Sequence, residues 1–541
     1  MIQEPPKPGA REEEDLRPSH AVTVSGHTAL ALKNNLERLI AYTISNPDIS
    51  PGDLSYTTTA RRTHYPFRVT VAEPTIERIR AALQNKQGLE PYNSLLSSPK
   101  RAVIFSFTGQ GATYAALAQE LYAKSTQFRA DISLFDGIAR QQGYPSLIPL
   151  VDGTVSDINQ LSAIQTQVGL VSIQMALSRL WRSWGVKPTA VIGHSLGEYA
   201  ALQVAGVLSI SDAIFLVGHR ARLLETHCQP YTHSMLAVSE SSAVVGKLLS
   251  TFPEEVEIAC SNSPRETVFA GRREVIDKLE VHLSGAKIRC TKLQVPFAFH
   301  TAQVDPILDN LEEVAKAINF GAPQITILSS YVGRPLAAEE RIDANYIRQH
   351  CRQTVQFANA VQSSQDQGLV NEASVFIEIG PHPICLGMIR GILGDTHLKV
   401  PTLKRKEEPW KVIVSGLASL HDQGFSINWT EYHRDFDHTH RLLSLPSYAF
   451  DNKRYWQEYR NDWTLRKGDA LPTIQPSDHK VEPSAKKLTS SVHRVVEENY
   501  SGSDPIAVFE TDLWDSQIYA AVSGHRVNGS ALCPSVSQSS L

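Results

Sequence analysis

The stretch AVIGHSLGEYAAL, residues 190–202, decides the fold. Its first three residues form an apolar run typical of a buried parallel strand, and the pattern becomes helical from Glu198 onward. Between them Ser195 lies on a tight turn whose glycines permit a strained backbone and close packing of the helix. The start of that helix offers N–H groups to a developing oxyanion. GxSxG also occurs by chance, but a strand before it and a helix after it favour Ser195 as a nucleophile.

The alternation of buried strands and helices continues on both sides of this turn. AVIFSF (102–107), ITILS (325–329) and VFIEI (375–379) are further apolar runs of the kind found in core strands. Residues 168–184 are strongly helical, and residues 115–124 are expected to form the helix after the first core strand. This order predicts an α/β fold with an α/β-hydrolase-like parallel-sheet core.

Two smaller units accompany the predicted core. Between about residues 233 and 299, short strands and helices follow the order β-α-β-β-α-β, which predicts an inserted ferredoxin-like subdomain. Before the core, two strand patterns and two helical patterns within residues 21–98 predict a small α/β unit. Residues 1–20 and 466–490 are rich in proline and charge and are expected to be flexible or disordered.

The composition restricts the class of protein. The 541 residues include 42% hydrophobic and 20% charged residues, so the chain can build a large core and global disorder is excluded. A formal charge of -4 argues against nucleic-acid and membrane-surface partners. Six cysteines without a CxxC pair exclude a zinc cluster and favour reduced thiols, so we expect no metal and a cytoplasmic location. Neither a signal peptide nor an apolar run long enough to span a membrane is found.

A serine nucleophile needs a base, and several side chains are candidates for supporting roles. His300, at the end of VPFAFH, is the best candidate base, although a histidine beside aromatic residues is more often a packed core residue. Arg220 would present a fork to a substrate carboxylate if its helix faces the cleft, but a solvated arginine is the simpler interpretation. Gln110, in a GQG segment after the first core strand, could supply a second oxyanion N–H, and His194 would line the site.

Six motifs together resemble a known family: FTGQGATY (107–114), TQVGLV (166–171), VIGHSLGEYAAL, HRARL (219–223), VPFAFH and FIEIGPHP (376–383). They occur in the order of malonyl-CoA:acyl-carrier-protein acyltransferase domains. The flanks, HAVTVS with LSYTTTARRTHYPFR before and LPSYAFDNKRYW after, are similar to the segments around this domain in fungal non-reducing (aromatic) polyketide synthases.

The resemblance implies a role for each candidate. Ser195 would attack the malonyl thioester, and His300 would act as base and then as acid. The amides of Gln110 and Leu196 would hold the oxyanion. Arg220 would clamp the malonyl carboxylate.

The resemblance also implies which residues surround these catalytic groups. Gln167 and His194 would line the substrate pocket, and Phe299 would crowd an α-methyl group and so favour malonyl. The histidine would be oriented by a backbone carbonyl from about residues 380–382 rather than by a carboxylate, although Asp305 is near it in sequence. No cofactor would be bound permanently, since malonyl-CoA is the substrate and phosphopantetheine belongs to a separate carrier domain.

The resemblance divides the chain into a ketosynthase-to-acyltransferase linker (21–98), an acyltransferase domain (99–403), a linker packing back on the core (404–465) and the truncated start of a product-template, hotdog-type domain (491–541). His525 would match the catalytic histidine of the last domain, which we expect to be inactive here. The chain would be part of a longer synthase, working with a carrier and a ketosynthase in cis or in trans.

Other functions remain open. A serine esterase of the α/β-hydrolase type shares GxSxG but should carry a catalytic acid ahead of its histidine. A starter-unit transacylase is closer, although that family usually has a cysteine where Ser195 stands. A non-catalytic fragment of a synthase is the third alternative.

Overall fold

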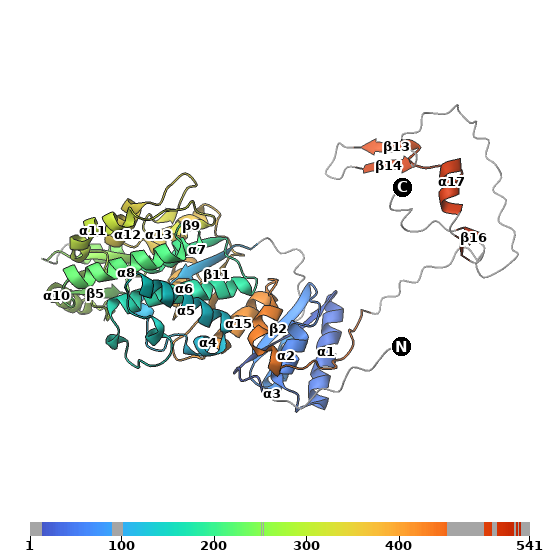
Figure 1. The fold of residues 1–541 in the computed structure, drawn as a ribbon, viewed down its shortest axis with the longest axis horizontal. Helices are drawn as coiled ribbons and strands as arrows, with labels where there is room; N and C mark the ends of the chain where they lie inside the picture. The colour runs from blue at the N-terminus through green and yellow to red at the C-terminus, as the bar shows by residue number, and fades with distance from the viewer. Residues whose placement is uncertain are drawn as a thin grey trace. The chain divides into compact units, whose positions relative to one another are not determined.

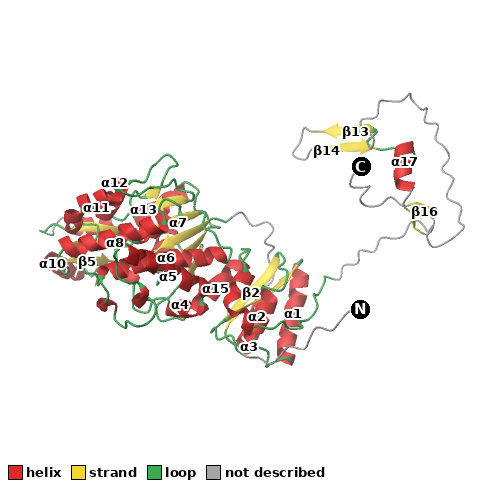
Figure 2. Cartoon of the chain, viewed as in Figure 1, coloured by secondary structure: helices red, strands yellow, loops and turns green. Residues whose placement is uncertain are grey.

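A computed structural model describes residues 13–88, 101–249, 252, 254–451, 489, 492–499, 506–523, 526–527 and 530–531. By internal contacts the chain divides into two units, Met1–Lys453 and Arg454–Leu541, which are described separately. In the first unit, strands are enclosed by helices (Figures 1 and 2). Within the described residues, no helix is both long and apolar enough to cross a membrane.

A six-stranded sheet forms the centre of the first unit, in the order β10-β9-β4-β3-β11-β12. Its strands are β3 (Val103–Phe107), β4 (Ala190–Gly193), β9 (Thr326–Ser329), β10 (Arg334–Pro335), β11 (Val375–Ile379) and β12 (Leu398–Pro401). All neighbours are parallel except the edge pair β9 and β10. The three central strands are buried along their whole length, as their continuous apolar sequences require, and the predicted α/β fold is confirmed.

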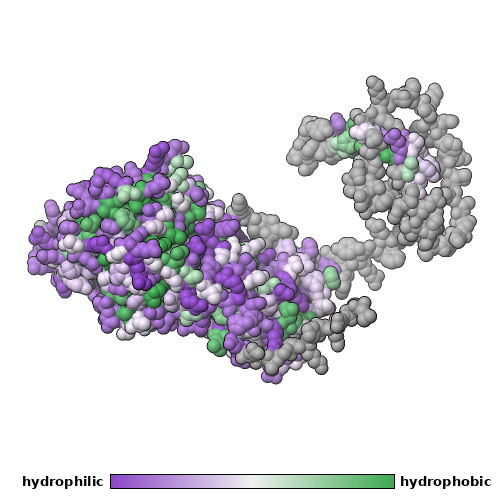
Figure 3. Space-filling model, viewed as in Figure 1, coloured by the Kyte–Doolittle hydropathy of each residue, from purple (hydrophilic) through white to green (hydrophobic). Residues whose placement is uncertain are grey.

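Helices on both sides of this sheet complete the core. They are α4 (Gln119–Lys124), α5 (Thr126–Gln141), α6 (Ala163–Ser183), α7 (Gly197–Val204), α8 (Ile210–His227), α11 (Leu308–Ala315), α12 (Ala344–Arg352), α13 (Phe357–Asp366), α14 (Ile384–Leu393) and α15 (Pro409–Asp422), with 3-10 turns η1 (Gln110–Ala112), η2 (Ile148–Leu150), η3 (Ile158–Gln160) and η4 (Ala302–Ile307). On the face of the first unit that Figure 3 shows, polar side chains cover the margins and apolar side chains gather toward the middle.

The helix expected over residues 115–124 is shorter than predicted. Ala116 and Ala118 have φ angles of 59° and 61°, in the left-handed region, and α4 begins only at Gln119. Two left-handed residues cannot continue a right-handed helix, so the alanine-rich sequence is misleading there.

A second sheet lies between α8 and η4 in the sequence and is antiparallel throughout, in the order β6-β7-β5-β8. It contains β5 (His233–Val238), β6 (Glu257–Ser263), β7 (Glu266–Arg272) and β8 (Cys290–Lys292), with α9 (Ser242–Leu249) and α10 (Arg273–Gly285). These elements share a hydrophobic core of their own. Its strand β6 is tied to the main body, since Ser261 N donates to Val355 O (2.8 Å) and Val355 N donates to Ala259 O (2.9 Å).

The N-terminal part forms a small two-stranded layer. Strands β1 (His20–Gly26) and β2 (Phe67–Glu73) pair antiparallel, with α1 (Ala29–Ser45), α2 (Pro51–Thr59) and α3 (Ile76–Gln87). Helix α15 contacts β1 and β2 as well as β12, so it joins this layer to the central sheet (Figure 1). The chain then continues through α16 (Trp429–His433) and η5 (Arg434–Thr439).

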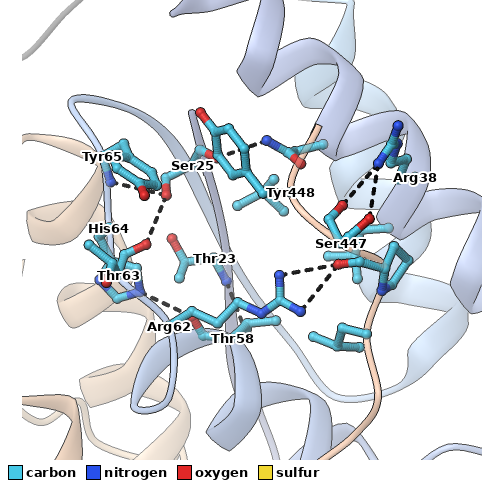
Figure 4. A pocket seen from close by; sticks show the side chains of 15 residues that line it. Thr23, Ser25, Arg38, Thr58, Arg62, Thr63, His64, Tyr65, Ser447 and Tyr448 are labelled. Atoms are coloured by element: carbon cyan, nitrogen blue, oxygen red, sulfur yellow. Dashed lines mark hydrogen bonds between the residues drawn. The ribbon is translucent and has the colours of Figure 1, made fainter. Parts of the chain in front are cut away.

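Residues 440–451 return along the N-terminal layer, where Leu445, Pro446, Ser447 and Tyr448 line one side of an open cavity (Figure 4). The Arg62 guanidinium donates to Pro446 O at 3.3 and 3.2 Å, and Arg38 Nη1 donates to Ser447 O at 3.0 Å. The Tyr448 hydroxyl accepts from His27 N at 2.7 Å. Both arginines of this cavity therefore bind backbone oxygens of the returning segment.

The second unit contains the antiparallel pair β13 (Arg494–Asn499) and β14 (Ile506–Glu510), the helix α17 (Ser516–Ser523) and the short pair β15 (Arg526–Val527) and β16 (Ser530–Ala531). Large apolar side chains are exposed here, with Trp514 at 81% and Phe509 at 51%. His525 lies outside the described residues.

Candidate active site

The turn after β4 holds Ser195 at the carboxyl edge of the central sheet with φ at 51°, in the left-handed region. The flanking glycines are sterically required. A Cβ on Gly193 would lie 2.3 Å from the Cα of Glu198, and a Cβ on Gly197 would lie 2.2 Å from the carbonyl oxygen of Phe107. The turn packs α7 directly against β3 and β4, which is the arrangement that presents a serine hydroxyl above a sheet.

Ser195 and His300 are 105 residues apart and in hydrogen-bond contact, with 2.7 Å between Oγ and Nε2. The other ring nitrogen, Nδ1, lies 3.0 Å from the backbone carbonyl oxygen of Gln353. Because a carbonyl can only accept, Nδ1 carries the proton and Nε2 presents a lone pair to the serine hydroxyl. This is the tautomer that a general base needs.

The orienting carbonyl was expected from residues 380–382, and that expectation is wrong. Gln353 follows the C-terminus of α12, and β6 holds this stretch in place through Val355. His382 instead accepts from Arg405 N at 3.3 Å, and Asp305 pairs with Arg352. A backbone group has no side-chain signature, so the sequence gives no signal for Gln353.

The His300 ring is buried, and its surroundings disfavour the charged form. Burial lowers the pKa of His300 well below its usual 6.5, and His350, Arg220 and His194 lower it further. His300 is therefore neutral at physiological pH and ready to accept a proton.

Two backbone segments flank Ser195 where an oxyanion would form. Gln110 opens η1 and Leu196 is the N-cap of α7, so their N–H groups are at positions without intrahelical partners. Gly109 lets the two segments approach, since a Cβ there would lie 3.0 Å from the carbonyl oxygen of His194.

The preceding residue, Thr108, is held by a buried carboxylate. Its hydroxyl donates to Glu378 Oε1 at 3.0 Å, and Glu378 also accepts from the first backbone N–H groups of α14. Burial raises the pKa of Glu378 to about 7, while these donors stabilise the ionised form. The contact fixes the segment before Gln110 to β11.

Arg220 comes from α8 and is almost completely buried, so the interpretation as a solvated arginine is wrong. Its Nη1 donates to Gln167 Oε1 at 2.6 Å, and its guanidinium lies 5.0 Å from the centroid of the Phe299 ring. Within the described part of the chain, no carboxylate forms an ion pair with it. The expected neighbours Arg220, Gln167 and Phe299 are thus brought together beside His300.

A pocket opens over Ser195 between the central sheet and the inserted one. Phe299 and His194 line it, whereas Arg220 and Gln167 do not. The remaining wall is mostly apolar and comes from both sheets; it includes Met235, Ala237, Cys260, Val268, Leu293, Val295, Ile384, Cys385 and Met388.

A polar link that the sequence did not predict crosses this pocket. His194 Nε2 donates to Asn262 Oδ1 at 2.8 Å, and Asn262 Nδ2 donates to Glu266 Oε1 at 2.9 Å. It joins the nucleophile turn to β6 and β7. Its members are far apart in sequence and form no recognisable motif.

Comparison with known proteins gives consistent matches. The family model "Acyl transferase domain" matches residues 104–421, and "CurL-like, PKS C-terminal" matches residues 20–83. The conidial pigment polyketide synthase PfmaE of Pestalotiopsis fici is 43% identical over 97% of this chain and 24% of its own length. The non-reducing polyketide synthase Preu8 of Preussia isomera is 42% identical over 96% of this chain and 24% of its own. The chain thus spans about a quarter of the length of these relatives.

Solved structures agree on the fold. The acyl transferase domain of ZmaA is similar with a TM-score of 0.69 at 23% identity, over 80% of this chain and 100% of that one. The acyltransferase domain from module 8 of the salinomycin polyketide synthase has a TM-score of 0.67 at 26% identity, over 76% of this chain and 98% of that one.

Proposed function

The chain belongs to the acyl transferase domain family of polyketide synthases, and from this premise we propose that it moves malonyl from malonyl-CoA, through an ester on Ser195, to the phosphopantetheine thiol of an acyl carrier protein. The observation that carries the proposal is the Ser195–His300–Gln353 arrangement, with a buried Arg220 beside it that pairs with no carboxylate among the described residues.

In the first half-reaction, the Ser195 oxygen attacks the thioester carbon while His300 Nε2 takes the hydroxyl proton. The amides of Gln110 and Leu196 stabilise the oxyanion, each by about 2.7–4 kcal/mol. The C–S bond then breaks, and the CoA thiolate leaves with the proton from His300. The second half-reaction reverses these steps with the carrier thiol, whose proton passes to His300 and then to the Ser195 oxygen.

The acyl group is selected by charge and shape in this proposal. The Arg220 guanidinium pairs with the malonyl carboxylate, and Gln167 supports the arginine through its side-chain oxygen. The Phe299 ring, which lines the pocket, crowds a methyl group on the α-carbon. His194 lines the same pocket next to the nucleophile. The apolar wall suits the pantetheine arm and limits the access of water to the ester.

We also propose finer assignments for the parts of the chain. The order β6-β7-β5-β8 supports a ferredoxin-like subdomain. We assign residues 21–98 and 404–465 to linkers around the transferase. We assign residues 491–541 to a product-template domain. The protein works in the cytoplasm in aromatic polyketide biosynthesis, with a carrier and a ketosynthase as partners in cis or in trans.

Transfer of malonyl to a carrier protein distinguishes the proposed acyltransferase from an esterase. The chain is incubated with malonyl-CoA and a holo carrier protein, and malonyl-carrier and free malonate are both quantified. We expect thioester on the carrier in excess of malonate, and little release from p-nitrophenyl esters. Malonate alone would favour a hydrolase, and absence of both products would favour a non-catalytic fragment.

A further inference from the structure

The backbone segment that carries the expected oxyanion donor Gln110, residues 108–112, is held in place at its first residue, Thr108. Thr108 directly follows β3 and is buried. Both Thr108 and Gln110 line the pocket that opens over Ser195. A small displacement of Thr108 would therefore move the Gln110 N–H relative to the serine, and errors of about 1 Å in such positions are costly for catalysis.

Two buried side chains from distant elements bind Thr108. The Thr108 hydroxyl donates to Glu378 Oε1 of β11 at 3.0 Å, and the Thr108 carbonyl oxygen accepts from Gln174 Nε2 of α6 at 2.7 Å. Glu378 and Gln174 are at most 1% exposed, so water does not compete for these bonds. Together the two bonds fix the side chain of Thr108 and the plane of the peptide that joins it to Gly109.

Gln174 makes its contact at a cost. Its Oε1 atom is buried and has no hydrogen-bond partner within the described part of the chain. A buried polar atom without a partner destabilises the fold, and an apolar side chain of similar size would avoid that cost. The bond to Thr108 is what the amide supplies and an apolar side chain could not, so the contact points to a role in holding this segment.

Glu378 is itself held firmly, so it can anchor the segment. Its two carboxylate oxygens accept from the backbone N–H groups of Ile384, Cys385 and Leu386, at 2.9, 2.9 and 2.8 Å. These residues open α14, and the free N–H groups and the dipole of a helix start favour a carboxylate there. Through Glu378 the hydroxyl of Thr108 is tied both to β11 and to the start of α14.

Close packing leaves Thr108 little room to move. A Cβ on Gly380 would lie 1.8 Å from Thr108 Oγ1, and a Cβ on Gly197 would lie 2.9 Å from the Thr108 carbonyl oxygen. Gly197 opens α7, whose N-cap Leu196 is the other expected oxyanion donor. Thr108 therefore packs against the helix of the second donor, and its position helps to set how the two donors lie relative to each other.

We propose that the oxyanion donor at Gln110 is held in place by three positioning residues, Thr108, Gln174 and Glu378. They fix the backbone between β3 and η1 so that this N–H faces the oxyanion formed when Ser195 attacks. The inference rests on the proposed acyl transfer and extends it to the side chains that place one of the oxyanion donors. Because the oxyanion forms only during the reaction, a misplaced donor slows acylation without weakening the binding of the acyl-CoA.

The test measures acylation of Ser195 by acetyl-CoA and by malonyl-CoA, over a series of concentrations, in Thr108→Val and Gln174→Met. Each substitution keeps the approximate size of the side chain and removes one bond within the proposed arrangement. The maximal acylation rate should fall about 10- to 100-fold with both thioesters, while the half-saturating concentration changes less than about twofold. The ratio of the malonyl rate to the acetyl rate should stay constant, because both acyl groups form the same oxyanion.

Two matched controls make the same substitutions outside this arrangement. Thr402 is buried, and its hydroxyl donates to the backbone oxygen of Glu378 at 2.6 Å rather than to its carboxylate. Gln165 is also on α6, and its Nε2 donates to Ser146 O at 2.9 Å. Thr402→Val and Gln165→Met should keep the maximal acylation rate of the unsubstituted chain. Thr108→Ser, which retains the hydroxyl, should recover most of the rate that Thr108→Val loses.

Circular dichroism establishes that each variant is folded before its rate is compared, and either Thr108→Val or Gln174→Met decides the question if the other does not fold. The inference is overturned if they acylate as fast as the two controls, or if only the half-saturating concentration rises. A shift in the malonyl-to-acetyl ratio would also contradict it. Failure of the proposed function has a different outcome, because the unsubstituted chain would then form no acyl-enzyme with either thioester.

Discussion

The Nδ1 atom of His300 lies 3.0 Å from the backbone carbonyl of Gln353, and this contact fixes the ring so that Nε2 faces Ser195. A neutral carbonyl orients the base without adding a negative charge beside it. A buried carboxylate in that place would raise the pKa of the histidine, whereas here burial lowers it.

The pH dependence of acylation follows from this environment. Because the pKa of His300 is held well below 6.5, the base stays neutral as the pH falls through about 6.5. We expect kcat/KM for acetyl loading to remain constant from about pH 7.5 to 6 and to decline only in more acidic solution. In Arg220→Ala the decline should move to higher pH, since a positive neighbour has been removed. A half-maximal rate at or above pH 6.5 in the unsubstituted chain would contradict the account.

Arg220→Ala also tests the carboxylate clamp. Removing the guanidinium should lower kcat/KM for malonyl at least about 10-fold while acetyl loading is retained, so that their ratio shifts toward acetyl. Steady-state loading from each CoA thioester measures the ratio. An unchanged malonyl-to-acetyl ratio would show that Arg220 does not bind the carboxylate.

The nucleophile turn depends on its two glycines. Gly193→Ala and Gly197→Ala place a Cβ within 2.3 and 2.2 Å of backbone atoms that cannot move freely, and each should lower the free energy of unfolding by at least about 1–3 kcal/mol. Gly137→Ala is the control, because Gly137 lies inside α5 with nothing within 4 Å of a new Cβ. Gly137→Ala should raise the free energy of unfolding by up to about 1 kcal/mol. Urea-induced unfolding measures the free energy of unfolding of the three variants. Equal changes in all three would refute the steric argument.

A buried neutral histidine, His421, lies where α15 packs against the N-terminal layer, and it makes the stability of this contact sensitive to acid. His421 Nδ1 lies 2.8 Å from Thr70 Oγ1, and burial lowers the pKa of His421 to about 2. The unfolded chain binds a proton near pH 6.5 while the folded chain does not. The stability that His421 contributes is therefore fully present above pH 6.5 and is lost as the pH falls toward 2, by about 1.4 kcal/mol per pH unit.

His421→Gln keeps a polar side chain without the titration. Its unfolding free energy should fall less steeply between about pH 6.5 and 4 than that of the unsubstituted chain. Denaturant unfolding at a series of pH values measures the slope. Parallel slopes in the two proteins would rule out His421 as a source of the acid sensitivity.

Much of this fold follows from local sequence. The apolar runs that become β3, β4 and β11 have a single consistent interpretation, and the glycines on either side of Ser195 identify the turn. Helix α2 is different, because PGDLSYTTT has no apolar periodicity. The hydroxyls of Thr57, Thr58 and Thr59 bond to carbonyls one turn back, and packing against β1 provides the burial that the sequence pattern lacks.

The candidate site likewise has parts that the sequence predicts and parts that it does not. Ser195 and His300 are side chains in motifs, and their contact is correctly expected. The Gln353 carbonyl acts through its backbone, and the link from His194 through Asn262 to Glu266 joins side chains that are far apart in sequence. Such contacts are properties of the folded chain, so no sequence pattern can reveal them.

The central claim is tested most directly by intact-mass analysis after incubation with malonyl-CoA, followed by peptide mapping. We predict one malonyl group per chain, located on the peptide that contains Ser195, and none in Ser195→Ala. Malonyl retained by Ser195→Ala, or no acyl-enzyme in the unsubstituted chain, would contradict the account.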